Sequence, residues 1–181
     1  NLDDEQLMAL KENGGVVQTV AFQSYVDPEK NQAHRDALDK LEKSVAEEMG
    51  FELMGRRARF GLSDSDREAY DIAVRPVQEA IDARVDAEVN SIASPVDVSD
   101  LADHIDYLVN LIGLEHVGIS SDFDGGGGVE GWNDAAETFN VTLELVRRGY
   151  TEQQIGMLWS GNLLRVLDEV QAVAAEIQAG S

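Results

Sequence analysis

Residues 116–128 read His116-Val117-Gly118-Ile119-Ser120-Ser121-Asp122-Phe123-Asp124-Gly125-Gly126-Gly127-Gly128, so that an apolar run passes directly into an acidic and glycine-rich segment. Residues 116–121 predict a short buried strand, and the four glycines cannot continue it. Upstream, residues 16–22 (VVQTVAF) are β-branched and almost continuously apolar. Such a run is typical of a strand buried on both faces of a parallel sheet.

Helices are expected on both sides of these strands. The first helix is predicted to start with Asn1 as its N-cap and to end at Asn13-Gly14, because glycine tolerates the left-handed cap conformation. The last helix is predicted to be amphipathic and to be separated from a short preceding helix by Ser160-Gly161-Asn162. In this scheme Asn162 caps the last helix and Arg165 pairs with an acid.

The order of elements is therefore helix, strand, long helical crossover, strand, helices. Strands that alternate with helices predict a parallel α/β fold. The crossover, about residues 27–92, is charged, and Leu38, Leu41 and Val45 follow the spacing of a helix face. We expect one domain over residues 1–181 with this helical insertion. Since a two-stranded sheet is marginal alone, the chain is expected to be part of a larger barrel or sheet, and its opening at a helix cap without methionine fits a cut chain.

Composition excludes several classes of partner and site. The chain of 181 residues has 35 acidic and 14 basic residues, a net charge of −21, which opposes binding to nucleic acid. It contains no cysteine, which excludes disulfides and thiolate zinc sites. No apolar run is long enough to span a membrane, and the acidic opening at residues 1–5 does not resemble a signal peptide. The chain is expected to be soluble, with its compartment left open.

Asp122 is the leading candidate for chemistry. In a barrel, the carboxyl end of each strand points toward the mouth of the active site, and glycines let a backbone approach a ligand closely. An aspartate in this place is also a common turn former or helix cap. Residues 125–128 lack the Lys-Ser/Thr of a phosphate-binding loop, and Asp122-Phe123-Asp124-Gly125 lacks the further acids of a calcium loop.

Four motifs follow one another along the chain. They are the opening segment, residues 1–17, then Asp103-His104-Ile105-Asp106-Tyr107, Val117-Gly118-Ile119-Ser120-Ser121-Asp122-Phe123-Asp124-Gly125 and Gly161-Asn162-Leu163-Leu164-Arg165-Val166. In this order they resemble the C-terminal part of the renal (membrane) dipeptidase family of zinc dipeptidases. The opening segment is similar to the family segment that follows its last metal-binding histidine.

This resemblance implies the C-terminal portion of a (β/α)8 TIM-like barrel, a two-zinc centre and hydrolysis of dipeptides. Asp122 matches the family aspartate that closes the last barrel strand, which would handle the proton of the attacking water or pass one to the leaving amine. Asp124, which is expected to accept backbone N–H bonds in the loop, and Gly125 are candidates for substrate binding. The family also implies a possible homodimer.

The family's zinc ligands have no match in this chain. They are a His-x-Asp pair, a bridging glutamate and two later histidines. His104-Ile105-Asp106 matches the His-x-Asp pattern, but in a helix the side chains of His104 and Asp106 would be about 200° apart around the axis. His104 and His34 are predicted to face solvent, His104 alternatively as a cap, and His116 is predicted at the end of the barrel away from the site. The metal ligands are therefore expected on a missing N-terminal half, and this fragment alone is expected to be inactive.

Two other functions stay open at this point. The chain is also compatible with a non-catalytic acidic helical module used for interaction. Another metallohydrolase of similar fold, such as a deaminase or amidohydrolase, also ends a strand in a site aspartate. The groups that recognise the carboxylate and amine of a dipeptide are expected outside this chain, so its specificity does not follow from the sequence.

Overall fold

The computed structural model describes residues 1–180, except for the side chain of residue 56. The chain divides into two compact units. Unit 1 comprises Asn1–Pro28 and the chain from Val96 onward, and unit 2 comprises Glu29–Pro95. No helix among the described residues has both the length and the apolarity needed to cross a membrane.

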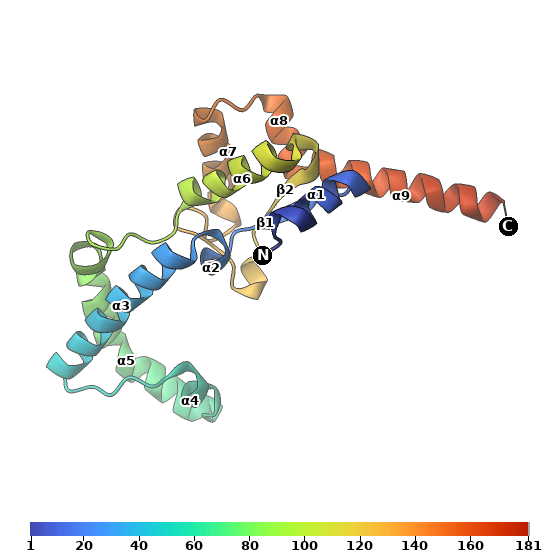
Figure 1. Ribbon diagram of the computed structural model, residues 1–181. Coiled ribbons are helices and arrows are strands. Elements are labelled where there is room, and N and C mark those ends of the chain that lie inside the picture. The colour runs from blue at the N-terminus through green and yellow to red at the C-terminus, as the bar shows by residue number, and fades with distance from the viewer. Residues whose placement is uncertain (181) are drawn as a thin grey trace. The chain divides into compact units, whose positions relative to one another are not determined.

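Unit 1 contains a two-stranded parallel sheet together with helices (Figure 1). Its elements are α1 (Asp4–Asn13), β1 (Val17–Val20), α2 (Gln23–Val26), α6 (Val98–Ile112), β2 (Val117–Ser120), α7 (Thr138–Arg147), α8 (Glu152–Gly156), a π-helical turn (Met157–Gly161) and α9 (Asn162–Ala179). The strands pair in register from Val17↔Val117 to Val20↔Ser120. The predicted helix-rich α/β pattern with two parallel strands is thus confirmed.

The two faces of this sheet differ in cover. Because successive residues of a strand point to opposite faces, Thr19, Val117 and Ile119 share one face, and all three are buried. Val117 and Ile119 belong to the main hydrophobic core, which also contains the inward residues of α6, α7 and the π-helical turn. On the other face, Gln18 and Ser120 remain partly exposed. Helices therefore cover the first face, while two polar side chains of the second face remain partly exposed.

Unit 2 is wholly helical. Its elements are α3 (Pro28–Glu48), α4 (Arg56–Phe60), α5 (Asp64–Val85) and a π-helical turn (Asp86–Asn90). They enclose a separate core of Leu41, Val45, Val77, Ile81 and Val89. Because these apolar side chains are buried within the unit, residues 29–95 have a hydrophobic core of their own.

The first helix starts later than the sequence predicted. Its N-cap is Asp3, whose side chain accepts a hydrogen bond from the backbone of Gln6, while the Gln6 side chain accepts one from the backbone of Asp3. Asn1 instead donates to the carbonyl of Tyr25 at 2.9 Å. The prediction of Asn1 as N-cap is wrong because Asp3 and Gln6 have the spacing of a reciprocal capping box, which satisfies two backbone donors at once.

Asn162 also has a different role from the predicted one. The helix does not stop at Ser160-Gly161-Asn162, because α8 continues through the π-helical turn into α9. Asn162 is 2% exposed, and its amide nitrogen donates to the carbonyls of Leu114 at 2.7 Å and Val117 at 2.8 Å. It therefore ties the helix to β2 rather than capping it.

Arg165 pairs with Glu169 at 3.1 Å, as the sequence predicted. Its other guanidinium nitrogen donates to the carbonyls of Gly14 and Glu115. Both of these carbonyls lie just before a strand, so α9 contacts the amino end of the sheet.

We predict that Asn162→Ala lowers the free energy of unfolding by about 2 to 4 kcal/mol, because two buried carbonyls lose their donor. Urea unfolding followed by tryptophan fluorescence measures this loss. The matched control is Asn110→Ala on the exposed face of α6, which should change stability by less than about 0.5 kcal/mol. Equal effects of the two substitutions would contradict the assigned role of Asn162.

Candidate active site

Asp122 lies where both strands end. Beyond β1, the backbone N–H of Ala21 donates to Ser120 O at 3.0 Å, and that of Gly128 donates to Ala21 O at 2.6 Å. The glycine-rich loop thus leaves β2 and returns to pair beside the end of β1. Asp122 occupies the start of this loop, at the carboxyl edge of the sheet.

The backbone of Asp122 has a left-handed conformation, with φ 57° and ψ 34°. Among the described residues it is the one non-glycine residue with positive φ. L-residues adopt this conformation at a cost, although aspartate tolerates it better than most. Two hydrogen bonds hold the turn, because the N–H groups of Gly125 and Gly127 donate to Asp122 O at 3.0 and 2.7 Å.

The turn requires glycine at two positions. A Cβ on Gly125 would lie 2.7 Å from Cγ of Asp122, and a Cβ on Gly127 would lie 2.8 Å from the carbonyl oxygen of Asp122. Real Cβ atoms essentially never lie this close to a heavy atom of another residue. The carboxyl group of Asp122 therefore packs directly over Gly125, in space that any other residue would fill.

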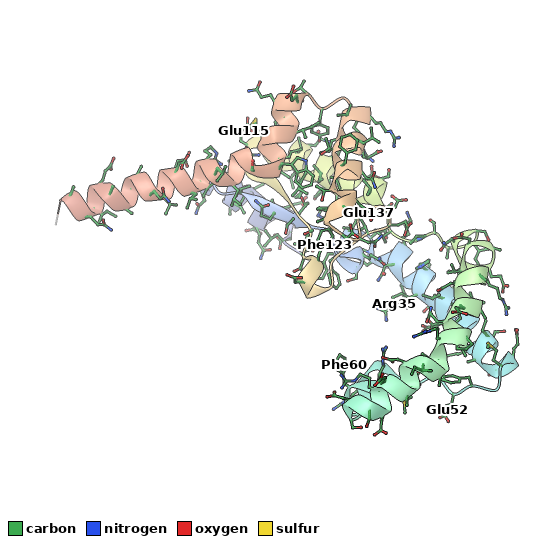
Figure 2. All side chains as sticks on the ribbon, turned by 180° about the vertical axis from the view of Figure 1, so that it is seen from behind. Arg35, Glu52, Phe60, Glu115, Phe123 and Glu137 are labelled. Carbon is green, nitrogen blue, oxygen red and sulfur yellow. The ribbon has the colours of Figure 1, made fainter. Side chains whose placement is uncertain are left out.

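Aromatic rings anchor the loop to unit 1. Phe123, labelled in Figure 2, packs edge-on against Trp132 with ring centroids 5.4 Å apart, and Trp132 packs in the same way against Trp159 at 5.8 Å. The indole nitrogens donate to hydroxyls of α7, Trp132 to Thr138 and Trp159 to Thr142. The residue that follows Asp122 is thus held by a chain of rings.

The side chain of Asp122 makes no capping hydrogen bond to the turn that follows it, and it is exposed. A role as helix cap, which the sequence left open, is therefore not the one observed. Asp124 is exposed as well. The N–H groups of Gly125 and Gly127 donate to the carbonyl oxygen of Asp122 rather than to the carboxylate of Asp124. A strained backbone that presents an exposed carboxylate is a recurrent feature of functional sites.

The larger cavities of the described chain lie elsewhere. One of about 550 Å³ belongs to unit 2, and one of about 120 Å³ in unit 1 is lined by Val26, Asp27, Asp100, Asp103 and His104. Neither includes Asp122.

The histidines take structural positions. His116 lies 2.8 Å through Nδ1 from Gly15 O, and His34 lies 2.8 Å from Ala93 O. His104 is half-buried beside the small cavity of unit 1. The expectation that His34 and His104 face solvent is thus only partly met, because His34 contacts a backbone carbonyl and His104 is half-buried.

Asp106, the other member of the rejected His-x-Asp pair, is engaged in unit 1. Its carboxylate accepts from Arg148 and from the Tyr150 hydroxyl, both at 2.6 Å. Within residues 1–180 no three His, Cys, Asp or Glu side chains are grouped so that they could hold a metal ion.

Comparison with known proteins gives the family. The model of the membrane dipeptidase family, peptidase family M19, matches residues 1–181. The chain belongs to this family. The resemblance carried by the motifs around Asp103, Val117 and Gly161 is thereby confirmed.

Individual relatives agree with this assignment. Dipeptidase aclJ of Aspergillus oryzae is 41% identical over 86 residues, which cover 47% of this chain and 20% of the relative. Dipeptidase 3 of Rattus norvegicus is 42% identical over 77 residues, 42% of this chain and 16% of the relative. The crystal structure of the probable dipeptidase PvdM from Pseudomonas aeruginosa aligns with 95% of this chain at 34% identity and a TM-score of 0.60.

The match spans only part of each relative. It covers 41% of the PvdM chain and 16 to 20% of the two curated dipeptidases. The described residues therefore correspond to a portion of a family domain.

We predict that Gly125→Ala destabilises the protein by about 1 to 3 kcal/mol, because the new methyl group meets the Asp122 carboxyl group. The same substitution should cost much less in an Asp122→Gly background, and a double-mutant cycle by urea unfolding measures this coupling. Gly156→Ala is the control, since a Cβ there meets nothing within 4 Å. Additive effects of the two substitutions would contradict the close packing.

His104 predicts a pH dependence of stability. Burial lowers the pKa of its imidazole below the usual 6.5, so the folded state disfavours the charged form. The associated stability is present above about pH 6.5 and is lost as the pH falls from there toward the lowered pKa. Melting temperatures between pH 8 and 5 should show a decline that is smaller in His104→Gln. An identical decline of the melting temperature in this variant would contradict the prediction.

Proposed function

We propose that the intact protein is a zinc-dependent dipeptidase and that this chain supplies its catalytic aspartate, Asp122. Family membership supports hydrolysis of dipeptides as the reaction. The single observation that carries the assignment to Asp122 is its left-handed backbone at the carboxyl end of β2, with the carboxylate exposed.

The half-covered sheet supports a part-barrel architecture. Parallel strands occur almost only in sheets that are covered on both faces, yet Gln18 and Ser120 lie on a face that unit 1 covers only partly. In a (β/α)8 barrel this face would point to the interior, and the carboxyl strand ends would open at the active site. We infer that the remainder of the barrel lies in the part of the family domain that the match does not span.

The proposed zinc ions would be held outside this chain. The described residues provide no set of side chains that could hold a zinc ion. No chemical step is therefore assigned to the metal. That the isolated fragment lacks peptidase activity is part of the same proposal.

Asp122 is proposed to act as a general base and then as a general acid. Its carboxylate would accept a proton from the attacking water while the water oxygen bonds to the peptide carbonyl carbon. As the C–N bond breaks, the same proton would pass to the leaving amine. An exposed carboxylate without a capping hydrogen bond is free for both transfers, and a rigid turn keeps it in place between them.

The neighbouring loop is proposed to border the dipeptide. Asp124 and Gly125 lie directly after Asp122, and both are exposed. Gly125 leaves room above its Cα for the catalytic carboxyl group, while Asp124 presents a negative charge that suits the ammonium group of a dipeptide. A homodimer remains a proposal from the family resemblance.

Asp122→Asn in the complete enzyme is expected to lower kcat by at least about a hundredfold, because the amide cannot accept the proton. The fold should persist, since the substitution keeps the size of the side chain and asparagine tolerates the left-handed conformation. Steady-state hydrolysis of a dipeptide gives the rates, and circular dichroism gives the fold. The control is Asp168→Asn on the exposed side of α9, which should keep normal turnover. Near-normal turnover of Asp122→Asn would remove this residue from the mechanism.

A further inference from the structure

Unit 2, which does not contain the proposed catalytic residue, has a cavity of its own. The cavity holds about 550 Å³ between α3, α4, α5 and the segment that joins α3 to α4. Its lining is Glu42, Leu53, Met54, Arg59, Phe60, Arg67, Tyr70, Val74, Gln78 and Ile81. A cavity of this size that combines apolar walls with convergent charged and polar groups is compatible with a small-molecule site.

The walls are held by contacts within unit 2. Ile81 belongs to the core of the unit, and Val74 and Leu53 pack against that core. The backbone N–H of Met54 donates to the Tyr70 hydroxyl at 2.9 Å, which fixes the connecting segment over α5. Phe60, labelled in Figure 2, forms part of the wall at the end of α4. Contacts within unit 2 thus hold the lining residues in place, and residues of its hydrophobic core form the apolar part of the cavity wall.

Arg67 brings a weakly paired positive charge to this cavity. Its nearest carboxylate, Asp64, is 4.0 Å away with a fully exposed side chain, and its Nη2 reaches Leu62 O only at 3.4 Å. Its Nε is buried without a hydrogen-bond partner. Arg59 differs, because it pairs with Asp71 at 2.7 Å. Of the two cavity arginines, Arg67 is therefore the one available to an anion.

Glu42 brings a negative charge to the same cavity. It is partly buried, and within the described part of unit 2 it forms no ion pair. Burial, and secondarily the nearby Asp39, raise the pKa of its carboxyl group, as expected for a carboxylate that lacks a cation. Glu42 and Arg67 thus line one cavity as charges of opposite sign, and among the described residues they do not pair with each other.

We propose that this cavity binds a free amino acid with an apolar side chain, with its carboxylate on Arg67 and its ammonium on Glu42. The apolar side chain would lie on Leu53, Val74 and Ile81. Two opposite charges that do not pair with each other match a zwitterion better than a simple anion or cation. The guanidinium suits a carboxylate because its N–H donors match the two oxygens.

This inference goes beyond the proposed hydrolysis and does not depend on it. The site is built from residues of unit 2 alone, whereas Asp122 belongs to unit 1. Binding should therefore be the same in Asp122→Asn as in the unsubstituted protein. If Asp122 proved not to be catalytic, the proposed amino-acid site would be unaffected. If the amino-acid site were disproved, the assignment of Asp122 would likewise be unaffected.

NMR of the full chain labelled with ¹³C-methyl methionine tests the proposal, because Met54 lines the cavity. Titration with millimolar L-leucine should shift the Met54 methyl resonance saturably, and Met54→Leu identifies that resonance. L-Leucinamide lacks the carboxylate and 4-methylpentanoate lacks the ammonium, so each should bind at least about tenfold more weakly. These analogues test both charges without any substitution.

Substitutions give the second arm. Arg67→Gln and Glu42→Gln should each weaken L-leucine binding about tenfold or more, with melting curves confirming that the variants fold. Arg75→Gln and Glu79→Gln remove equal charges from exposed positions of α5 outside the cavity, and both should bind normally. The proposal is overturned if L-leucine gives no saturable shift at Met54, if both analogues bind as well as L-leucine, or if the Arg67 and Glu42 variants match their controls.

Discussion

The parallel pairing of β1 with β2 is the interaction on which unit 1 depends. It joins Val17 to Val117 and continues for four residues, so it brings together segments a hundred positions apart. A pairing this short cannot be stable by itself. Its stability comes from the core beneath it, where Val117 and Ile119 pack with residues of α6, and from Asn162, which binds the carbonyl of Val117.

The same pairing determines where the proposed chemistry can occur. Because both strands run in one direction, their carboxyl ends meet at one edge, and the glycine loop bridges that edge from Asp122 to Gly128. The left-handed conformation of Asp122 is unfavourable taken alone. The two hydrogen bonds to its carbonyl and the packing of Phe123 on Trp132 compensate for it. The strain is maintained by its surroundings, which is the usual condition for a strained functional residue.

Much of this architecture follows from the sequence, for identifiable reasons. The strand at 117–120 was predictable because an apolar run ends abruptly in glycines, and the pairing of Arg165 with Glu169 was predictable because the residues are four apart on a helix. The role of Asn162 was not, since its two acceptors, Leu114 and Val117, are more than forty residues away. The left-handed backbone of Asp122 was also not predicted from the sequence, although the glycines at 125 and 127, which make room for it, are a local signal.

The cavity of unit 2 shows why some sites cannot be predicted from spacing. Glu42 lies on α3 and Arg67 on α5, and only the packing of those helices brings both to one cavity. The long contact of Arg67 with Asp64, at 4.0 Å, is visible in the structure but does not follow from the sequence. The Nε of Arg67 is buried without a hydrogen-bond partner among the described residues. A ligand carboxylate would supply the acceptor that this donor lacks.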